Sequence, residues 1–270
     1  MDSENYQEYL DFAIELASEA KEIMLSYFYG DVESHYKSDE TIVTRADTEI
    51  NHLLITKVKE KYPNHSVDGE EEKYGNGNYK WICDPVDGTA MYARKIPTAT
   101  FSLALVNDGN PIVGVALDPF TDSLYTAIKG KGAYLNHQRI YVSDIGFSNM
   151  ESVSHFDMMQ HTPYKLEDVL KELSDKTYFV SIGSIVRAAL CVASGEFNLA
   201  IFPGVHKKYC DIAAVKLIVE EAGGIVTDLF GNNQRYDKDI NGAIISNKMV
   251  YEETLKVIKK FLENKKFTEQ

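Results

Sequence analysis

The chain has 270 residues, 44% of them hydrophobic, which is enough to bury a core in one large domain or in two tightly joined halves. Acidic residues outnumber basic ones by 41 to 28, and the resulting formal charge of -13 argues against nonspecific binding to nucleic acid. The acidity does not exclude an anionic substrate, because bound cations can reverse the sign of the local field.

No segment has the features of a signal peptide or a membrane helix. The first residues, Met1-Asp2-Ser3-Glu4, lack the basic and apolar regions of a secretory leader. The longest apolar runs, 101–106 and 112–117, are far shorter than the ~20 residues that a membrane helix needs. We therefore expect a soluble, cytoplasmic protein with no membrane partner. The three cysteines have no CxxC spacing, so we expect small buried side chains rather than disulfides or a zinc site.

The first half of the chain begins with two helices and continues with paired strands. Apolar residues at helical spacing predict helices over 5–29 and 46–61. The stretch 62–79 is rich in Pro, Asn, Gly and Glu and is interpreted as a loop. Strong turn sequences at 107–110 and 129–131 predict two hairpins. The strands expected around them are 80–84, 99–106, 112–117, 123–128 and 132–135.

The second half alternates helices with strands. The expected helices are 165–173, 185–194, 210–222 and 250–262, and the expected strands are 178–181, 197–202, 225–227 and 243–245. This order predicts a mixed α/β (α+β) protein in which helices and sheets form layers. We expect two halves, residues 1–145 and 146–270, joined in one compact unit.

The segment Asp84-Pro85-Val86-Asp87-Gly88-Thr89 lies between an apolar strand and a segment that can turn helical. Its two carboxylates can bind hard cations, its glycine allows backbone N–H groups to approach an anion, and its hydroxyl can orient a water. Such a set suits divalent-metal and phosphate chemistry. The alternative is an ordinary turn, since Asp, Pro and Gly all favour turns.

Two other acidic positions are candidates, although each has a structural alternative. Glu70 belongs to the run Gly69-Glu70-Glu71-Glu72, which by itself is typical of a solvated face. Asp211 begins an apolar helix, where an aspartate is also a good N-cap. Three histidines show no pairing that suggests a phosphohistidine or zinc mechanism, and we expect ordinary surface or loop residues at His52, His65 and His137.

Together these segments resemble the inositol monophosphatase family. Residues 84–89 are similar to its first signature, and residues 210–224 are similar to its second, with Cys210 where a tryptophan is usual. The acidic loop at 69–71, Lys37 with the segment 41–47, and the turn Gly183-Ser184 also resemble family segments. The resemblance covers nearly the whole chain in the right order.

The resemblance implies a layered αβαβα sandwich and a Mg²⁺-dependent, lithium-sensitive phosphomonoesterase that is commonly a homodimer. It implies that Glu70, Asp84 and the carbonyl of Val86 hold one Mg²⁺. A second ion would be held by Asp84, Asp87 and Asp211, with two or three ions in each active site. These oxygen ligands agree with the preference of Mg²⁺.

The resemblance also implies the catalytic and substrate-binding residues. Thr89 and Glu70 would position the attacking water, and Asp47 would accept a hydrogen bond from the Thr89 hydroxyl. No covalent intermediate is required. The residues expected to contact phosphate or substrate are Asp87, Gly88, Thr89, Gly183, Ser184 and Lys207.

Substrate choice is where the chain departs from the family pattern. Inositol-cleaving members carry a polyol-binding glutamate shortly before the second signature, and the equivalent stretch 202–209 has no acidic residue. Lys207 and Lys208 stand there instead. One hypothesis is that they bind a second anionic group of the substrate, and the alternative is that they are solvated loop residues. The segment 90–97, which lines the substrate mouth in relatives, departs as well.

Three classes of function remain. The first is an enzyme similar to inositol-1-phosphatase. The second is a phosphatase of the same superfamily acting on fructose 1,6-bisphosphate, 3′-phosphoadenosine 5′-phosphate, NADP or histidinol phosphate. The third is a regulatory protein that only binds phosphate or metal, which is disfavoured because the whole acidic and hydroxyl set is present. Structural calcium is also disfavoured, since there is no twelve-residue EF-hand loop.

Overall fold

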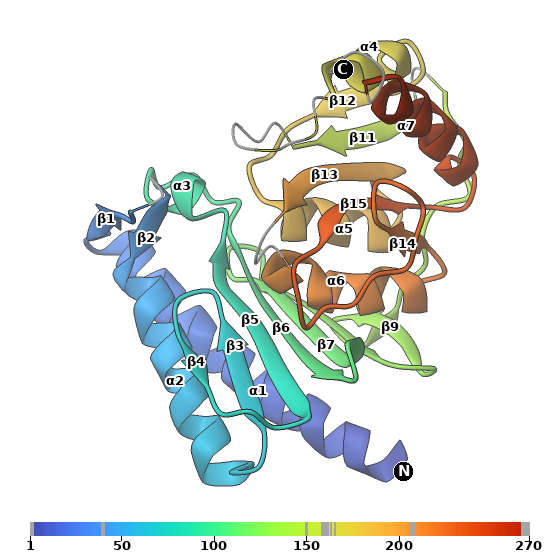
Figure 1. The fold of residues 1–270 in the computed structure, drawn as a ribbon. Coiled ribbons are helices and arrows are strands. Elements are labelled where there is room, and N and C mark those ends of the chain that lie inside the picture. Colours follow the sequence, from blue (N-terminus) through green and yellow to red (C-terminus); the bar gives the residue numbers. More distant parts are fainter. Residues whose placement is uncertain are drawn as a thin grey trace.

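The computed structural model describes residues 3–38, 41–148, 151–157, 162, 164, 166–205 and 209–265. They form five layers in the order helix, sheet, helix, sheet, helix (Figure 1). The expected αβαβα sandwich is therefore confirmed. Among the helices in these ranges, none combines the length and apolar character needed to cross a bilayer.

The outer layer next to the larger sheet consists of α1 (Ser3–Tyr29) and α2 (Arg45–Lys61). The sheet has the strand order β10-β9-β8-β7-β6-β5-β3-β4, and every pairing is antiparallel except the parallel pair β3 and β5. Its strands are β3 (Ser66–Gly69), β4 (Lys73–Tyr74), β5 (Tyr79–Asp87), β6 (Thr100–Asn107), β7 (Asn110–Asp118), β8 (Ser123–Ile128), β9 (Gly132–Leu135) and β10 (Gln138–Arg139).

Successive side chains along β6 point to opposite faces of the sheet, and each face packs in a different hydrophobic core. Leu103 and Leu105 are fully buried in the cluster that contains α1 and α2 residues, whereas Ala104 is buried in the cluster that contains α5 and α6 residues. Small residues on the second face bring the middle helices close to the strands. A side chain on Gly114 would place its Cβ 2.9 Å from the carbonyl oxygen of Ala214 in α6.

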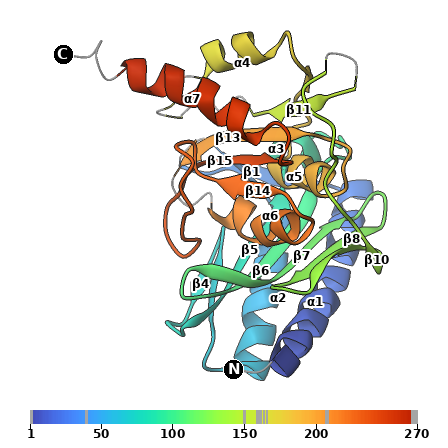
Figure 2. The same cartoon turned by 90° about the vertical axis from the view of Figure 1, so that its right-hand side faces the viewer.

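The middle layer contains α5 (Ile185–Ala193) and α6 (Tyr209–Glu221), which lie between the two sheets (Figure 2). Apart from the exposed Glu220 and the half-buried Arg187 and Glu221, their residues are buried, as expected for helices covered on both faces. The core between the sheets therefore includes residues from both halves of the chain.

The smaller sheet has the order β12-β11-β13-β15-β14, and α4 (Glu167–Leu173) and α7 (Tyr251–Lys265) cover its outer face. β11 is parallel to both of its neighbours, and β13, β15 and β14 are antiparallel. The strands are β11 (Val153–Phe156), β12 (Tyr178–Val180), β13 (Leu199–Val205), β14 (Ile225–Thr227) and β15 (Asn241–Ser246). A short hairpin of β1 (Ser34–Tyr36) and β2 (Ile42–Thr44), with the short helix α3 (Thr89–Tyr92), completes the described elements.

One sequence prediction about residues 62–79 is wrong. The stretch contains β3 and β4 rather than only loop, because β3 pairs with β5 along its whole length. His65, expected to be a surface or loop residue, lies outside the helices and strands just before β3 and is only 9% exposed. Its ring stacks against Tyr62 and Tyr79, and its Nδ1 accepts a hydrogen bond from Trp81 Nε1 at 3.2 Å. The expectation of three buried, unbridged cysteines is confirmed.

Candidate active site

The candidate site lies where β5 ends. The pairing of β5 with β6 shifts register between Asp84 and Asp87, which marks a bulge at Pro85 and Val86. In a regular strand, residues three positions apart point to opposite faces, and the bulge lets these two carboxylates converge. The bulge is fixed locally, since Asp84 Oδ1 accepts a hydrogen bond from the Val86 N–H at 3.1 Å.

Asp211, in the first turn of α6, joins Asp84 and Asp87 to form a trio of buried carboxylates. Each of the three is at most 6% exposed, and one ligand atom from each lies within 4.8 Å of the others. Like charges at this separation repel by about 3.5 kcal/mol per pair at an effective dielectric of about 20. Three buried oxygen donors with this mutual repulsion fit a hard divalent cation such as Mg²⁺.

The N-terminus of α5 holds Asp87 in place. Its Oδ2 accepts hydrogen bonds from Ser184 Oγ, from the Val186 N–H at 3.1 Å and from Thr100 Oγ1 at 3.4 Å. Ser184 is also the N-cap of α5, accepting from the Arg187 N–H at 3.0 Å. Ser184, expected from the sequence to contact substrate, is thus bonded to a candidate metal ligand, and its contact with substrate stays a prediction.

The two glycine turns expected to bind phosphate lie against each other. Gly88 has φ +86°, a conformation that favours glycine, and a Cβ there would lie 2.9 Å from the carbonyl oxygen of Gly183. Gly183, at φ +74°, is packed in turn against the Met91 side chain of α3. The structure therefore brings the turn after β5 and the turn before α5 together beside Asp87.

The Thr89 hydroxyl lies near Asp47 but has a shorter acceptor, and the catalytic roles expected of the two residues stay predictions. Thr89 Oγ1 lies 2.8 Å from the Val86 carbonyl oxygen and 3.4 Å from Asp47 Oδ1. Its single proton is donated to one acceptor at a time. Asp47 also closes the capping box of α2, where its Oδ2 accepts from the Thr44 backbone N–H at 2.8 Å and the Thr44 hydroxyl at 2.5 Å. Burial, reinforced by the charges of Glu70 and Glu71, raises the pKa of Asp47 to about 7.

Glu70 belongs to a second acidic group rather than to the trio. Its ligand atom lies within 4.8 Å of those of Asp47 and Glu71. Lys37, just after β1, places its ammonium 3.3 Å from Glu70 and 2.5 Å from Glu71. Burial alone would lower the pKa of Lys37, but the two carboxylates outweigh it and the pKa is raised. Whether Glu70 shares a metal with Asp84 stays a prediction, and Lys207 lies outside the described residues.

Sequence reasoning gave no role to several groups that hold this site together. Lys37 was noted only as part of a resembling segment, and Thr100 and Val186 were not singled out. Thr100 lies in β6 opposite Asp87 in the strand register, a relation that follows from the pairing and not from the local sequence. The hairpin turn at 107–110 fixes only the register of β6 with β7, so it could not have indicated this contact.

Comparisons with known proteins show one family of similar sequences and structures. The model of the inositol monophosphatase family matches residues 5–263. Human inositol monophosphatase 1 is 30% identical over 245 residues, covering 84% of this chain and 85% of its own. A fructose-1,6-bisphosphatase/inositol-1-monophosphatase of Thermotoga maritima is 29% identical over 258 residues, covering 94% and 97%. A solved IMPase from Thermotoga maritima has a TM-score of 0.85 at 27% identity, covering 95% of this chain and 99% of that one.

Proposed function

This chain belongs to the inositol monophosphatase family, whose members are phosphatases, and from this premise we propose that it hydrolyses a small phosphorylated metabolite with Mg²⁺ as its cofactor. The observation that carries the proposal is the convergence of Asp84, Asp87 and Asp211 beside the Gly88 and Gly183 turns. A cation site next to a backbone anion site is what hydrolysis of a phosphate monoester needs.

Separate residues would bind the cation, the phosphate and the attacking water. Asp84, Asp87 and Asp211 would hold the cation, which when bound neutralises phosphate charge and lowers the pKa of a coordinated water. The N–H groups of Gly88 and Thr89 would bind the phosphate oxygens. The Thr89 hydroxyl would orient the attacking water. Asp47 is close enough to accept a hydrogen bond from the Thr89 hydroxyl.

Glu70 would complete the arrangement from the second acidic group. Glu70 and Thr89 would together position the attacking water. This role requires that the Lys37 ammonium no longer neutralises the Glu70 carboxylate. Two neighbouring acidic groups support two or three Mg²⁺ ions per active site in this proposal.

The substrate class we favour is a monophosphorylated polyol such as inositol 1-phosphate. A bisphosphate is the second candidate, favoured by the two activities in the name of the Thermotoga relative. An IMPase/NADP phosphatase complexed with Mg²⁺ and phosphate also shares the fold, with a TM-score of 0.81 at 24% identity. In this second case Lys207 would meet the additional anionic group. We also propose lithium inhibition, a homodimeric assembly and a cytoplasmic location.

Release of inorganic phosphate tests the proposal. The panel contains inositol 1-phosphate, fructose 1,6-bisphosphate, 3′-phosphoadenosine 5′-phosphate, NADP and histidinol phosphate, each assayed with Mg²⁺, with EDTA and with Mg²⁺ plus Li⁺. We expect Mg²⁺-dependent, Li⁺-inhibited release, and loss of about 10³-fold or more in Asp84→Asn, since one side chain then lacks the charge needed at the metal. Absence of release from every substrate would favour the non-enzymatic alternative, and light scattering would test the dimer.

A further inference from the structure

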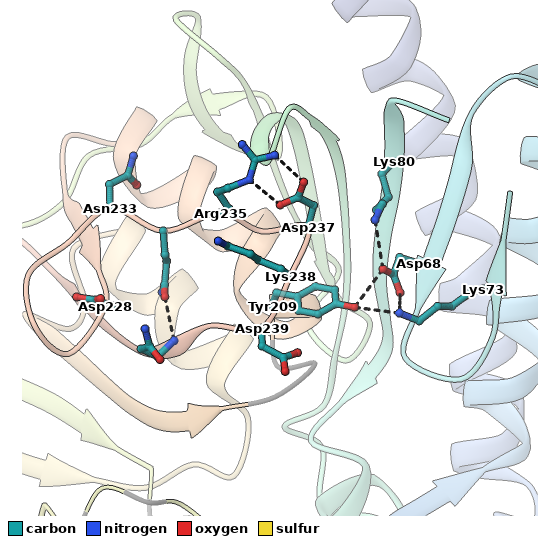
Figure 3. A pocket seen from close by; sticks show the side chains of 12 residues that line it. Asp68, Lys73, Lys80, Tyr209, Asp228, Asn233, Arg235, Asp237, Lys238 and Asp239 are labelled. Carbon is teal, nitrogen blue, oxygen red and sulfur yellow. Dashed lines mark hydrogen bonds and ion pairs between the residues drawn. The ribbon is translucent and has the colours of Figure 1, made fainter. Parts of the chain in front are cut away.

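A polar groove of about 760 Å³ lies on the side of β3, β4 and β5 that faces the segment 228–241 (Figure 3). At its base is Asp68, a β3 residue whose side chain is only 7% exposed. Tyr209, the first residue of α6, covers it and is 3% exposed. Asp68 stands two residues before Glu70, and Tyr209 stands two residues before Asp211. The contact between them therefore links the segments that carry two candidate metal ligands.

Asp68 has partners on several sides. The Tyr209 hydroxyl donates to Asp68 Oδ2 at 3.0 Å, and Lys73 Nζ lies 2.7 Å from Asp68 Oδ1 and 3.2 Å from the Tyr209 oxygen, closing a triangle (Figure 3). Lys80 Nζ lies 3.7 Å from Asp68 Oδ2. The Cys210 thiol is 3.8 Å from the Asp68 carbonyl oxygen. The first two residues of α6 are thus both attached to β3.

The pairing of the charges in the groove indicates a structural link between β3 and α6 rather than a separate anion site. Lys73 and Lys80 are both engaged by Asp68. Arg235 is paired with Asp108 and Asp237. Lys238 is the remaining cation of the groove, so the described residues contain no cluster of uncommitted cations there, and the buried carboxylate of Asp68 is the centre of the network.

We infer that Asp68 and Tyr209 are positioning residues that fix the start of α6, and with it Asp211, relative to the strand that leads to Glu70. The inference rests on the proposed metal-dependent function. Asp211 must be held close to Asp84 and Asp87 although the like charges repel. A buried, charge-assisted hydrogen bond two residues earlier supplies an anchor for that position.

The test removes one hydroxyl. Tyr209→Phe keeps the buried ring and loses the hydroxyl's bonds to Asp68 and Lys73. We expect the dissociation constant for Mg²⁺, measured by calorimetry on the substrate-free protein, to rise about tenfold, the lower end of what loss of an outer-shell partner costs. The rate of phosphate release at saturating Mg²⁺ should stay within about twofold, because the groups that touch substrate are unchanged.

Two further variants make the test specific. Asp68→Asn keeps an acceptor for Tyr209 but loses the charge, so its Mg²⁺ affinity should lie between those of wild type and Tyr209→Phe. The matched control is Tyr62→Phe, which removes a tyrosine hydroxyl that donates to the Glu8 carboxylate at 3.2 Å, away from the trio. It should bind Mg²⁺ like wild type. Hydrogen exchange over the first two turns of α6 should accelerate in Tyr209→Phe, less so in Asp68→Asn, and not in Tyr62→Phe.

The outcomes separate this inference from the proposed function. Unchanged Mg²⁺ affinity and unchanged exchange in Tyr209→Phe would overturn the positioning role, even if wild type is an active phosphatase. Weaker Mg²⁺ binding and faster exchange would support it, even if wild type releases phosphate from none of the substrates, a result that would count against the proposed function alone.

Discussion

Replacing Asp211 by asparagine should make the metal-free protein more stable while removing its response to Mg²⁺. The substitution keeps the shape of a side chain that is 3% exposed. It removes one of three negative charges whose ligand atoms lie within 4.8 Å of one another. A residue that only capped α6 would behave in the opposite way, since an acidic group in the first turn of a helix stabilises it.

The magnitude follows from the separation of the charges. At 4.8 Å, the limit of their separation, and an effective dielectric of about 20, each pair repels by about 3.5 kcal/mol, so the two pairs that involve Asp211 give about 7 kcal/mol before any relaxation. Relaxation of the side chains and water penetration reduce this repulsion, and the helix terminus returns about 0.3–1 kcal/mol. We therefore expect a net gain of about 1–3 kcal/mol in the free energy of unfolding without metal.

Urea unfolding in EDTA and in Mg²⁺ measures both effects. Trp81 is the single tryptophan and is fully buried, so its fluorescence reports the transition. At a Mg²⁺ concentration 100 times the dissociation constant, wild type should gain about 2.7 kcal/mol and Asp211→Asn much less. In Mg²⁺ we therefore expect wild type to be as stable as Asp211→Asn or more stable than it.

Asp118→Asn is the matched control, because Asp118 is a buried carboxylate that belongs to neither acidic group. It is 3% exposed, pairs with Arg187 and accepts the Phe120 N–H at 2.8 Å. Its variant should lose about 1–3 kcal/mol both with and without Mg²⁺ and keep the Mg²⁺ response. If Asp211→Asn loses stability in EDTA like the control, or keeps a full Mg²⁺ response, the trio is not a metal site.

Three other predictions concern the turn beside the trio and two buried titratable groups. Gly88→Ala should lower phosphate release at least about tenfold and the free energy of unfolding by about 1–2 kcal/mol. The reason is that the new Cβ would meet the Gly183 oxygen at a residue whose φ is positive. Normal activity of this variant would contradict the contact. Asp47, with its pKa raised by burial from 3.8 to about 7, keeps a proton that the unfolded chain releases, so its contribution to metal-free stability falls as pH rises through that window. Asp47→Asn should abolish this slope in urea titrations, and an unchanged slope would refute the assignment. Burial lowers the pKa of His155 from 6.5 to about 4, so on acidification the unfolded chain binds this proton first and the folded protein loses stability. His155→Phe should remove this loss, which amounts to about 3 kcal/mol. If the loss persists in the variant, His155 is not its source.

Elements with strong local signals were predicted close to their observed bounds. The apolar repeat predicted a helix over 5–29, and α1 spans Ser3–Tyr29. The turn at 107–110 predicted the hairpin of β6 and β7, which pair out to Asn107 and Asn110. These signals suffice because helix periodicity and turn conformation depend on residues close together in the chain.

Some of the short strands were missed because pairing with distant strands forms them. β3 and β11 have few residues, and each is held by pairing with a strand that lies farther along the chain. The site motif was expected to leave its strand after Asp84, whereas β5 continues to Asp87 through the bulge. Proline and aspartate disfavour strands locally, and the pairing with β6 overrides that preference.

By itself the sequence determined the chemistry that is available: carboxylates for a hard cation, a glycine turn for an anion and a hydroxyl for water. Only the tertiary structure decided which of these groups meet. Asp211 reaches Asp84 and Asp87 because α6 is packed between two sheets with its first turn fixed to Asp68, while Glu70 lies instead with Asp47 and Glu71. Contacts between residues so far apart in the chain depend on side-chain packing across layers, and no local pattern encodes that packing.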